Sequence, residues 1–190
     1  MKTIRTFIAV DLPAAARAAW GGVAQQLAAQ LPSTAVRWVK PERMHLTLRF
    51  LGDTAVSQLP MLADSLDQMA QQFAPFSLRL SHLGCFPNEL RPRVVWVGLQ
   101  GDTKALAVLK KGVDAALVPL GWEMETRPFQ AHLTVGRVKD ARQLAGVQWG
   151  MAVEEVEVPV TAVHLIESQL RPSGPIYSVR HIAALNRLKA

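Results

Sequence analysis

Two copies of one short motif constrain this chain more than any other feature of its sequence. Residues 45–48 read His-Leu-Thr-Leu and residues 132–135 read His-Leu-Thr-Val, and an arginine follows each copy, at Arg49 and Arg137. Both copies lie in runs that are typical of β-strands. Because their surroundings differ too much for a short-period repeat array, the pair indicates two halves of a duplicated fold.

On a strand, side chains alternate between the two faces. The His and Thr of each motif therefore share one face, roughly 6.5–7 Å apart along the strand, and the aliphatic residues take the other. That separation brackets a small tetrahedral anion, to which a threonine hydroxyl can donate while an imidazole reaches an oxygen on either side. Two such strands facing each other would place two histidines and two threonines around one phosphate.

Hydrolysis of a cyclic phosphodiester needs a base for the attacking water, an acid for the departing oxygen and donors for the charge on phosphate. Imidazoles change protonation state near neutral pH, so His45 and His132 can fill both proton-transfer roles. Thr47, Thr134 and Arg137 can supply the donors. The pattern therefore predicts acid–base chemistry on phosphate without a metal or another cofactor.

A zinc site is the competing interpretation of the paired histidines. It would need further ligands, and the other histidines (His82, His164 and His181) and Cys85 show no close spacing to either motif. The sequence also contains no nucleophile-elbow motif and no Walker-type phosphate loop. These observations argue against serine hydrolase chemistry and against an ATP-driven ligase.

Hydrophobic periodicity predicts the element order β-α-β-β-α-β-β-α-β-β-β. Strands are expected at 3–10, 36–39, 44–51 (ended by Gly52), 76–83, 93–99, 129–138, 153–170 (one strand, or two broken near Pro159) and 176–185. Helices are expected after an Asp11 cap up to Pro32, from Asp53 or Thr54, where Pro60 lies in the first turns or delays the start, and from Asp102 or Thr103 to Leu117. Neighbouring strand pairs favour an antiparallel α+β fold, and no linker divides residues 1–190, which we expect to form a single domain.

The net charge of +6 and the isoelectric point of about 10.0 favour a polyanionic partner, although composition alone leaves open a basic protein of another kind. Apolar runs are too short for a membrane span or a signal peptide. The single Cys85 fits a reducing compartment. We expect a cytoplasmic monomer with no membrane association and no obligate protein partner.

The motifs and their flanks resemble the two-histidine (2H) phosphoesterase superfamily, and within it the RNA 2′,3′-cyclic phosphodiesterases, which are also named 2′-5′ RNA ligases. The segments that carry the resemblance are residues 7–13, 37–42, 45–52, 93–98, 127–129, 132–137 and 168–177. The resemblance implies two pseudo-symmetric lobes, each an antiparallel sheet with helices on the outside, and an active-site cleft between them.

The resemblance also implies hydrolysis of RNA 2′,3′-cyclic phosphate ends to 2′-phosphate. It further implies ATP-independent joining of such ends to a 5′-hydroxyl through a 2′-5′ bond. It makes His45 the proton donor and His132 the proton acceptor. Thr47 and Thr134 become phosphate donors, and Arg137 an added cationic contact. The expected partner is RNA or an oligonucleotide that ends in a cyclic phosphate.

Three aromatic residues are candidates for stacking on a terminal base, namely Phe7, Phe129 and Tyr177. Core packing is the alternative, and it is favoured for Phe7. Lys40 and Arg127 are candidates for the cleft mouth, and Arg49 for a solvated strand face.

Two other functions stay open at this point. A non-catalytic RNA-binding module on the same fold would be expected to lack a motif histidine or threonine, and both pairs are intact here. A phosphodiesterase for a small cyclic phosphate of the ADP-ribose type would keep both motifs.

Overall fold

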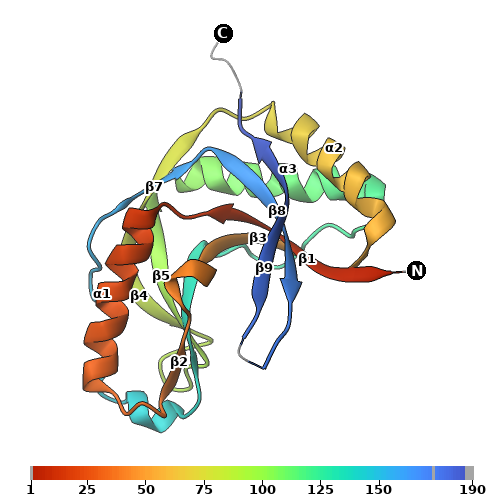
Figure 1. Ribbon diagram of the computed structural model, residues 1–190. Helices are drawn as coiled ribbons and strands as arrows, with labels where there is room; N and C mark the ends of the chain where they lie inside the picture. Colours follow the sequence, from red (N-terminus) through yellow and green to blue (C-terminus); the bar gives the residue numbers. More distant parts are fainter. Residues whose placement is uncertain (1, 173, 187–190) are drawn as a thin grey trace.

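The computed structural model describes residues 2–172 and 174–186, whose strands form two antiparallel sheets (Figure 1). Sheet A has the order β3 (His45–Ala55), β1 (Thr3–Asp11), β8 (Ala162–Gln169) and β9 (Ile176–Ala184). Sheet B has the order β2 (Val36–Trp38), β6 (His132–Val138), β5 (Val94–Gly101), β4 (Phe76–Phe86) and β7 (Glu157–Val160). The predicted α+β class is confirmed.

The two sheets repeat one arrangement. The order β6-β5-β4-β7 in sheet B matches β3-β1-β8-β9 in sheet A, and β2 is an additional strand beside β6. The motif strands β3 and β6 therefore hold equivalent places. The expected strand at 153–170 is two strands, because β7 pairs with β4 whereas β8 pairs with β1 in the other sheet. The chain crosses between the sheets at Thr161, just beyond Pro159.

Within residues 2–172 and 174–186, three α-helices lie outside the sheets: α1 (Ala14–Gln30), α2 (Leu59–Ala70) and α3 (Thr103–Leu117). In Figure 1, α1 lies beside β4 and β5, while α2 and α3 lie together at the other end of the molecule. Trp20 of α1 packs on Trp38 of β2, with ring centroids 6.0 Å apart, so α1 covers sheet B. Within the described residues, no helix has the length and apolar character of a membrane span.

The motif strands bury their aliphatic face, as the alternation predicts. Leu46, Leu133 and Val135 have no exposed surface, and they belong to one hydrophobic core that draws on both sheets and all three helices. The histidine and threonine of each motif are half-buried on the opposite face. The single domain over residues 1–190 stays a prediction.

Strand β3 runs past the point where the sequence predicts its end. Gly52 has a φ of 76°, and the pairing with β1 shifts there, so that Leu51 is an extra residue in a β-bulge. The strand continues to Ala55, and the buried hydroxyls of Thr6 and Thr54 are hydrogen bonded 2.7 Å apart. The expected helix start at Asp53 or Thr54 is therefore wrong. Helix α2 begins at Leu59, with Pro60 in its first turn as expected.

Other boundaries also differ from the prediction; strand β4, for example, continues to Phe86 and β5 to Gly101. Residues 129–131 are not in a strand, because β6 begins at His132 itself. Asp11 does not cap α1; it ends β1 and forms an ion pair with Arg17, while Pro13 occupies the cap position. Short 3-10 helices connect several elements: Pro41–Arg43, Val56–Gln58, Val118–Leu120 and Ala141–Leu144.

Candidate active site

The two motifs border a continuous cleft made of two adjoining pockets. His45 lines a pocket of about 220 Å³, here called the His45 pocket, and His132 lines one of about 440 Å³, the His132 pocket. Both pockets are lined by Thr47, Phe50, Thr134 and Arg137. The structure thus brings together the two histidines, the two threonines and the arginine that the sequence singles out.

Each motif histidine is held by the same hydrogen bond. Nδ1 of His45 donates to the carbonyl oxygen of Arg43 at 3.0 Å, and Nδ1 of His132 donates to that of Gln130 at 2.7 Å. In both cases the carbonyl lies two residues before the histidine. Because a carbonyl only accepts, Nδ1 carries the proton, and Nε2 is left as the nitrogen available to a ligand.

His45 is enclosed by aromatic rings. The ring of Phe7 lies 4.6 Å from the imidazole and that of Tyr177 lies 5.1 Å away, measured between centroids. This burial lowers the pKa of His45 to about 4, against the opposing effects of the Arg43 carbonyl and the charge of Asp11. His45 is therefore neutral in the free protein at pH 7.

His132 has a different environment. The ring of Phe86 meets it edge-on with centroids 4.9 Å apart, and Trp96 lies at 6.5 Å. Its hydrogen bond to Gln130 is exposed to solvent, whereas that of His45 is partly buried.

The arginines that follow the motifs have different places. Arg137 is exposed and borders both pockets. It lies five residues after His132, which would turn it to the opposite face of a regular strand. A bulge in β6 opposite Val95 and Trp96 makes Val135 an extra residue and returns Arg137 to the cleft.

Arg49 is nearly buried, so the expectation of a solvated strand face is wrong. It donates to the carbonyl oxygen of Glu123 at 2.7 Å and pairs with the Glu125 carboxylate at 3.2 Å. Asp114 of α3 lies 3.8 Å away and forms an ion pair with Lys110. Arg49 therefore ties β3 to the irregular segment that leads into β6.

The three aromatic candidates also separate. Phe7 is only 3% exposed and packs on His45, so the core-packing alternative accounts for it. Tyr177 is half-buried in the His45 pocket, and burial raises the pKa of its hydroxyl. Phe129 lines the His132 pocket with Lys110 Nζ 5.8 Å from its ring centroid. Base stacking by Tyr177 and Phe129 stays a prediction.

The sequence predicts only some of the other residues that line the cleft. Lys40 and Arg127 line the cleft, one in each pocket, as the sequence predicts. The sequence reasoning missed several further residues of the lining: Arg37, Trp38, Arg43, Phe50 and Phe86. Phe50 is the clearest omission, since its side chain is 70% exposed between the two pockets. Its position follows from a second β-bulge, in which the pairing with β1 shifts between Ile8 and Ala9 and Leu48 is the extra residue.

Two of the remaining histidines have polar contacts outside the cleft, whereas the buried Nδ1 of His164 has no hydrogen-bond partner among the described residues. His181 Nε2 lies 2.8 Å from Asp67 Oδ1, and His82 lies beside the Ser81 hydroxyl at 2.9 Å. Across residues 2–172 and 174–186, no three His, Cys, Asp or Glu side chains converge as a metal-binding group.

A duplicated antiparallel fold with a His-x-Thr pair on each of two equivalent strands defines a two-histidine phosphoesterase. A family model of LigT-like phosphoesterases matches residues 10–96 and again residues 97–177, so that each match contains one motif. The chain belongs to this family, which confirms the resemblance seen in the sequence.

Named relatives cover almost the whole chain. An RNA 2′,3′-cyclic phosphodiesterase of Methanothermobacter thermautotrophicus is 33% identical over 179 residues, covering 92% of this chain and 95% of the relative. One of Archaeoglobus fulgidus is 34% identical over 176 residues, covering 92% and 96%. Among solved structures, a Thermus thermophilus protein has a TM-score of 0.81 at 31% identity, covering 97% of this chain and 99% of its own. Escherichia coli LigT complexed with 3′-AMP has a TM-score of 0.76 at 25% identity, covering 98% and 100%.

Proposed function

We propose that this protein opens 2′,3′-cyclic phosphates at RNA ends to 2′-phosphates, using His45 and His132 as a metal-free acid–base pair. The observation that carries the proposal is the paired anchoring of the two imidazoles, each of which offers Nε2 to one cleft that Thr47 and Thr134 also line. The relatives named RNA 2′,3′-cyclic phosphodiesterase support the substrate.

The cyclic phosphate is held where the two pockets meet. The hydroxyls of Thr47 and Thr134 donate to its non-bridging oxygens, and Arg137 compensates the charge that develops on them. Such donors stabilise the transition state most when they are already in position before the reaction.

The two histidines divide the proton transfers. His132 takes a proton from the attacking water, the water oxygen bonds to phosphorus, and the bond from phosphorus to the 3′ oxygen breaks. His45 protonates that oxygen, which leaves a 3′-hydroxyl and a 2′-phosphate. The resemblance assigns these two roles. The two anchoring hydrogen bonds do not distinguish the donor from the acceptor, because they are alike.

The donor role requires a protonated His45, whereas burial keeps it neutral in the free protein. A cyclic phosphate carries a negative charge, and a negative charge within about 4–6 Å favours the imidazolium. The substrate therefore raises the pKa of His45, and binding takes up a proton. Ligation follows the same path, with the 5′-hydroxyl of a second RNA in place of water and no need for ATP.

The test is incubation with an oligonucleotide that ends in a 2′,3′-cyclic phosphate, in the presence of EDTA, with identification of the product end. We expect a 2′-phosphate product, formed at the same rate with EDTA as without it. Activity that disappears in EDTA and returns with a divalent ion would contradict the metal-free mechanism. Binding without turnover would favour an RNA-binding module, and faster turnover of an ADP-ribose-type cyclic phosphate would favour a small-molecule substrate. The cytoplasmic location and the monomeric state stay predictions.

A further inference from the structure

The His45 pocket is strongly basic. Arg37, Lys40, Arg43 and Arg137 line it, and none of the described residues that line it is acidic. Only Arg137 of these four also lines the His132 pocket. The other three come from β2 and from the connection between β2 and β3, where sheet B has the strand that sheet A lacks. Arg49, Lys110 and Arg127 also line the His132 pocket, but each of them forms an ion pair with Glu125 or Asp114. The described lining of the His45 pocket, in contrast, holds no carboxylate.

Two of these guanidinium groups converge beneath the connection between β8 and β9. Gly174, with a φ of 103°, lies so close that a Cβ there would overlap Arg43 Nη1 and come within 3.4 Å of Arg37 Nη2. Arg37 is also paired in register with Arg137 across β2 and β6. Neighbouring guanidinium groups repel each other because they carry the same charge, and an anion bound between them would be attracted by both.

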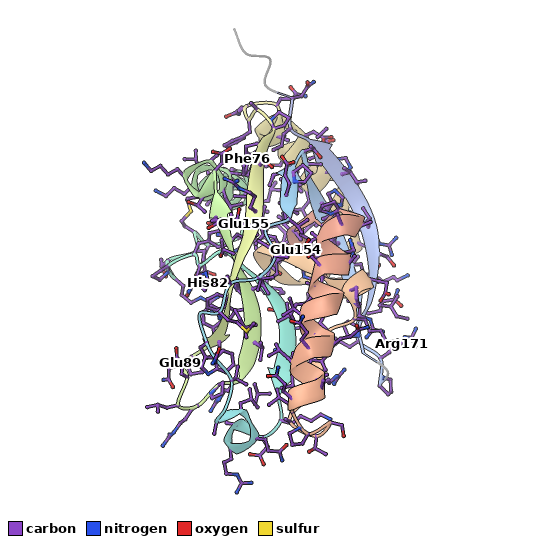
Figure 2. All side chains as sticks on the ribbon, turned by 90° about the vertical axis from the view of Figure 1, so that its left-hand side faces the viewer. Phe76, His82, Glu89, Glu154, Glu155 and Arg171 are labelled. Atoms are coloured by element: carbon purple, nitrogen blue, oxygen red, sulfur yellow. The ribbon has the colours of Figure 1, made fainter. Side chains whose placement is uncertain are left out.

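The acidic side chains labelled in Figure 2 lie elsewhere. Glu89, Glu154 and Glu155 lie on the side of β4 and β7, whereas Arg171 lies across the molecule at the end of the β8–β9 hairpin.

We propose that the His45 pocket binds a second phosphate, the phosphodiester immediately upstream of the nucleotide that carries the cyclic phosphate. This inference rests on the proposed function. A cyclic phosphate closes the 3′ end of its chain, so every other phosphate of the substrate lies on the 5′ side. Arg37, Lys40 and Arg43 recognise that linkage, and they make an RNA chain a better ligand than a single nucleotide.

The experiment compares two dinucleotides that both end in a 2′-phosphate and differ only in their internal linkage. One has a phosphodiester, and the other has a neutral methylphosphonate. We expect the charged ligand to bind about tenfold more tightly or better at low salt, as a charged hydrogen-bonding contact would give. Its log Kd should also depend more steeply on log salt, by about 0.7 for one additional phosphate contact.

The ratio of the Kd of the methylphosphonate ligand to the Kd of the phosphodiester ligand should fall toward one in the variant R37Q/K40Q. It should also fall in G174A, in which the added methyl group displaces Arg43 without removing a charge. K104Q is the matched control, since Lys104 is an exposed cation on α3 that does not line the pocket, and its ratio should equal that of the wild type.

A wild-type ratio near one would overturn the inference, and so would a ratio that persists in R37Q/K40Q. Turnover of a mononucleoside 2′,3′-cyclic phosphate is measured separately. Its absence would count against the proposed function, while the binding ratio would still decide whether the second phosphate is bound.

Discussion

His45 and His132 begin equivalent strands, and each donates Nδ1 to the carbonyl oxygen two residues upstream. Their surroundings are nevertheless different. Phe7 and Tyr177 enclose His45 and lower its pKa to about 4, whereas the hydrogen bond of His132 is open to solvent. Duplication has kept the backbone geometry that presents each imidazole, and the packing of neighbouring elements has made the two imidazoles chemically unlike.

The arginines extend the contrast. Arg49 is nearly buried in an ion network that joins β3 to the segment before β6, while Arg137 is exposed in the cleft. Each arginine follows a motif in the sequence. One half thus uses its arginine to connect β3 to the segment before β6, and the other leaves its arginine in the cleft.

The largest expected effect comes from removing either imidazole. His45→Ala and His132→Ala should each lower kcat on a cyclic-phosphate oligonucleotide by about 10³-fold, because each loses one proton transfer. His82→Ala is the control, since His82 is exposed on β4 and lines neither cleft pocket. Near wild-type activity in one motif variant would mean that the halves do not share the chemistry.

A substrate with sulfur in place of the bridging 3′ oxygen sharpens this result. The thiolate leaves without protonation, so His45→Ala should recover much of its rate, and His132→Ala should stay inactive. Recovery in His132→Ala instead would reverse the two roles.

Because Arg49 is nearly buried and Arg137 is exposed, we expect substitution of Arg49 to lower stability and substitution of Arg137 to weaken ligand binding. Arg49→Met removes one cation from beside Glu125 and Asp114, which keep Arg127 and Lys110 as partners, and should lower the free energy of unfolding by about 1.5–3 kcal/mol. Arg137→Met should change stability by no more than about 0.5 kcal/mol, because its side chain is exposed. It should instead weaken binding of a 2′-phosphate oligonucleotide about tenfold. Denaturant unfolding and equilibrium titration measure the two quantities, and equal destabilisation by both changes would contradict the distinction.

Unlike the two arginines, the two motif threonines should have equivalent effects on kcat when they are substituted. Thr47→Ala and Thr134→Ala each remove one donor to the phosphate and should lower kcat about a hundredfold. Thr→Ser at either position keeps the hydroxyl and should restore most of the rate. Wild-type rates in both alanine variants would mean that the hydroxyls do not reach the phosphate.

The difference between the two histidines also predicts how stability depends on pH. The pKa of His45 is about 4 in the folded protein and near 6.5 in the unfolded chain, so the unfolded chain binds the proton first as the pH falls. The contribution is fully present above pH 6.5 and is lost between pH 6.5 and 4. Relative to pH 7.5, the wild type should lose about 2 kcal/mol more than His45→Gln at pH 5. Parallel stability curves for the two proteins would show that His45 is not buried as described.

Local pattern was enough to predict the α+β class, the duplication and most of the element order. Strict alternation places His45, Thr47, His132 and Thr134 opposite a fully buried aliphatic face, and the structure has this arrangement. The buried stripe of α1 at Trp20, Val23 and Leu27 follows from helical spacing in the same way. These features depend on neighbours along the chain, which a sequence records directly.

Only the tertiary structure decided how far the two halves differ. The bulges at Leu48 and Val135 place Phe50 and Arg137 in the cleft, and bulges leave little trace in a hydrophobic pattern. The pKa of His45 depends on rings from β1 and β9, and the convergence of Arg37 and Arg43 depends on a glycine more than 130 residues further along the chain. Burial and charge at a site arise from groups that are distant in sequence. The motif therefore predicts the type of chemistry, while the packing of the two sheets determines the burial and the charge around the motif residues.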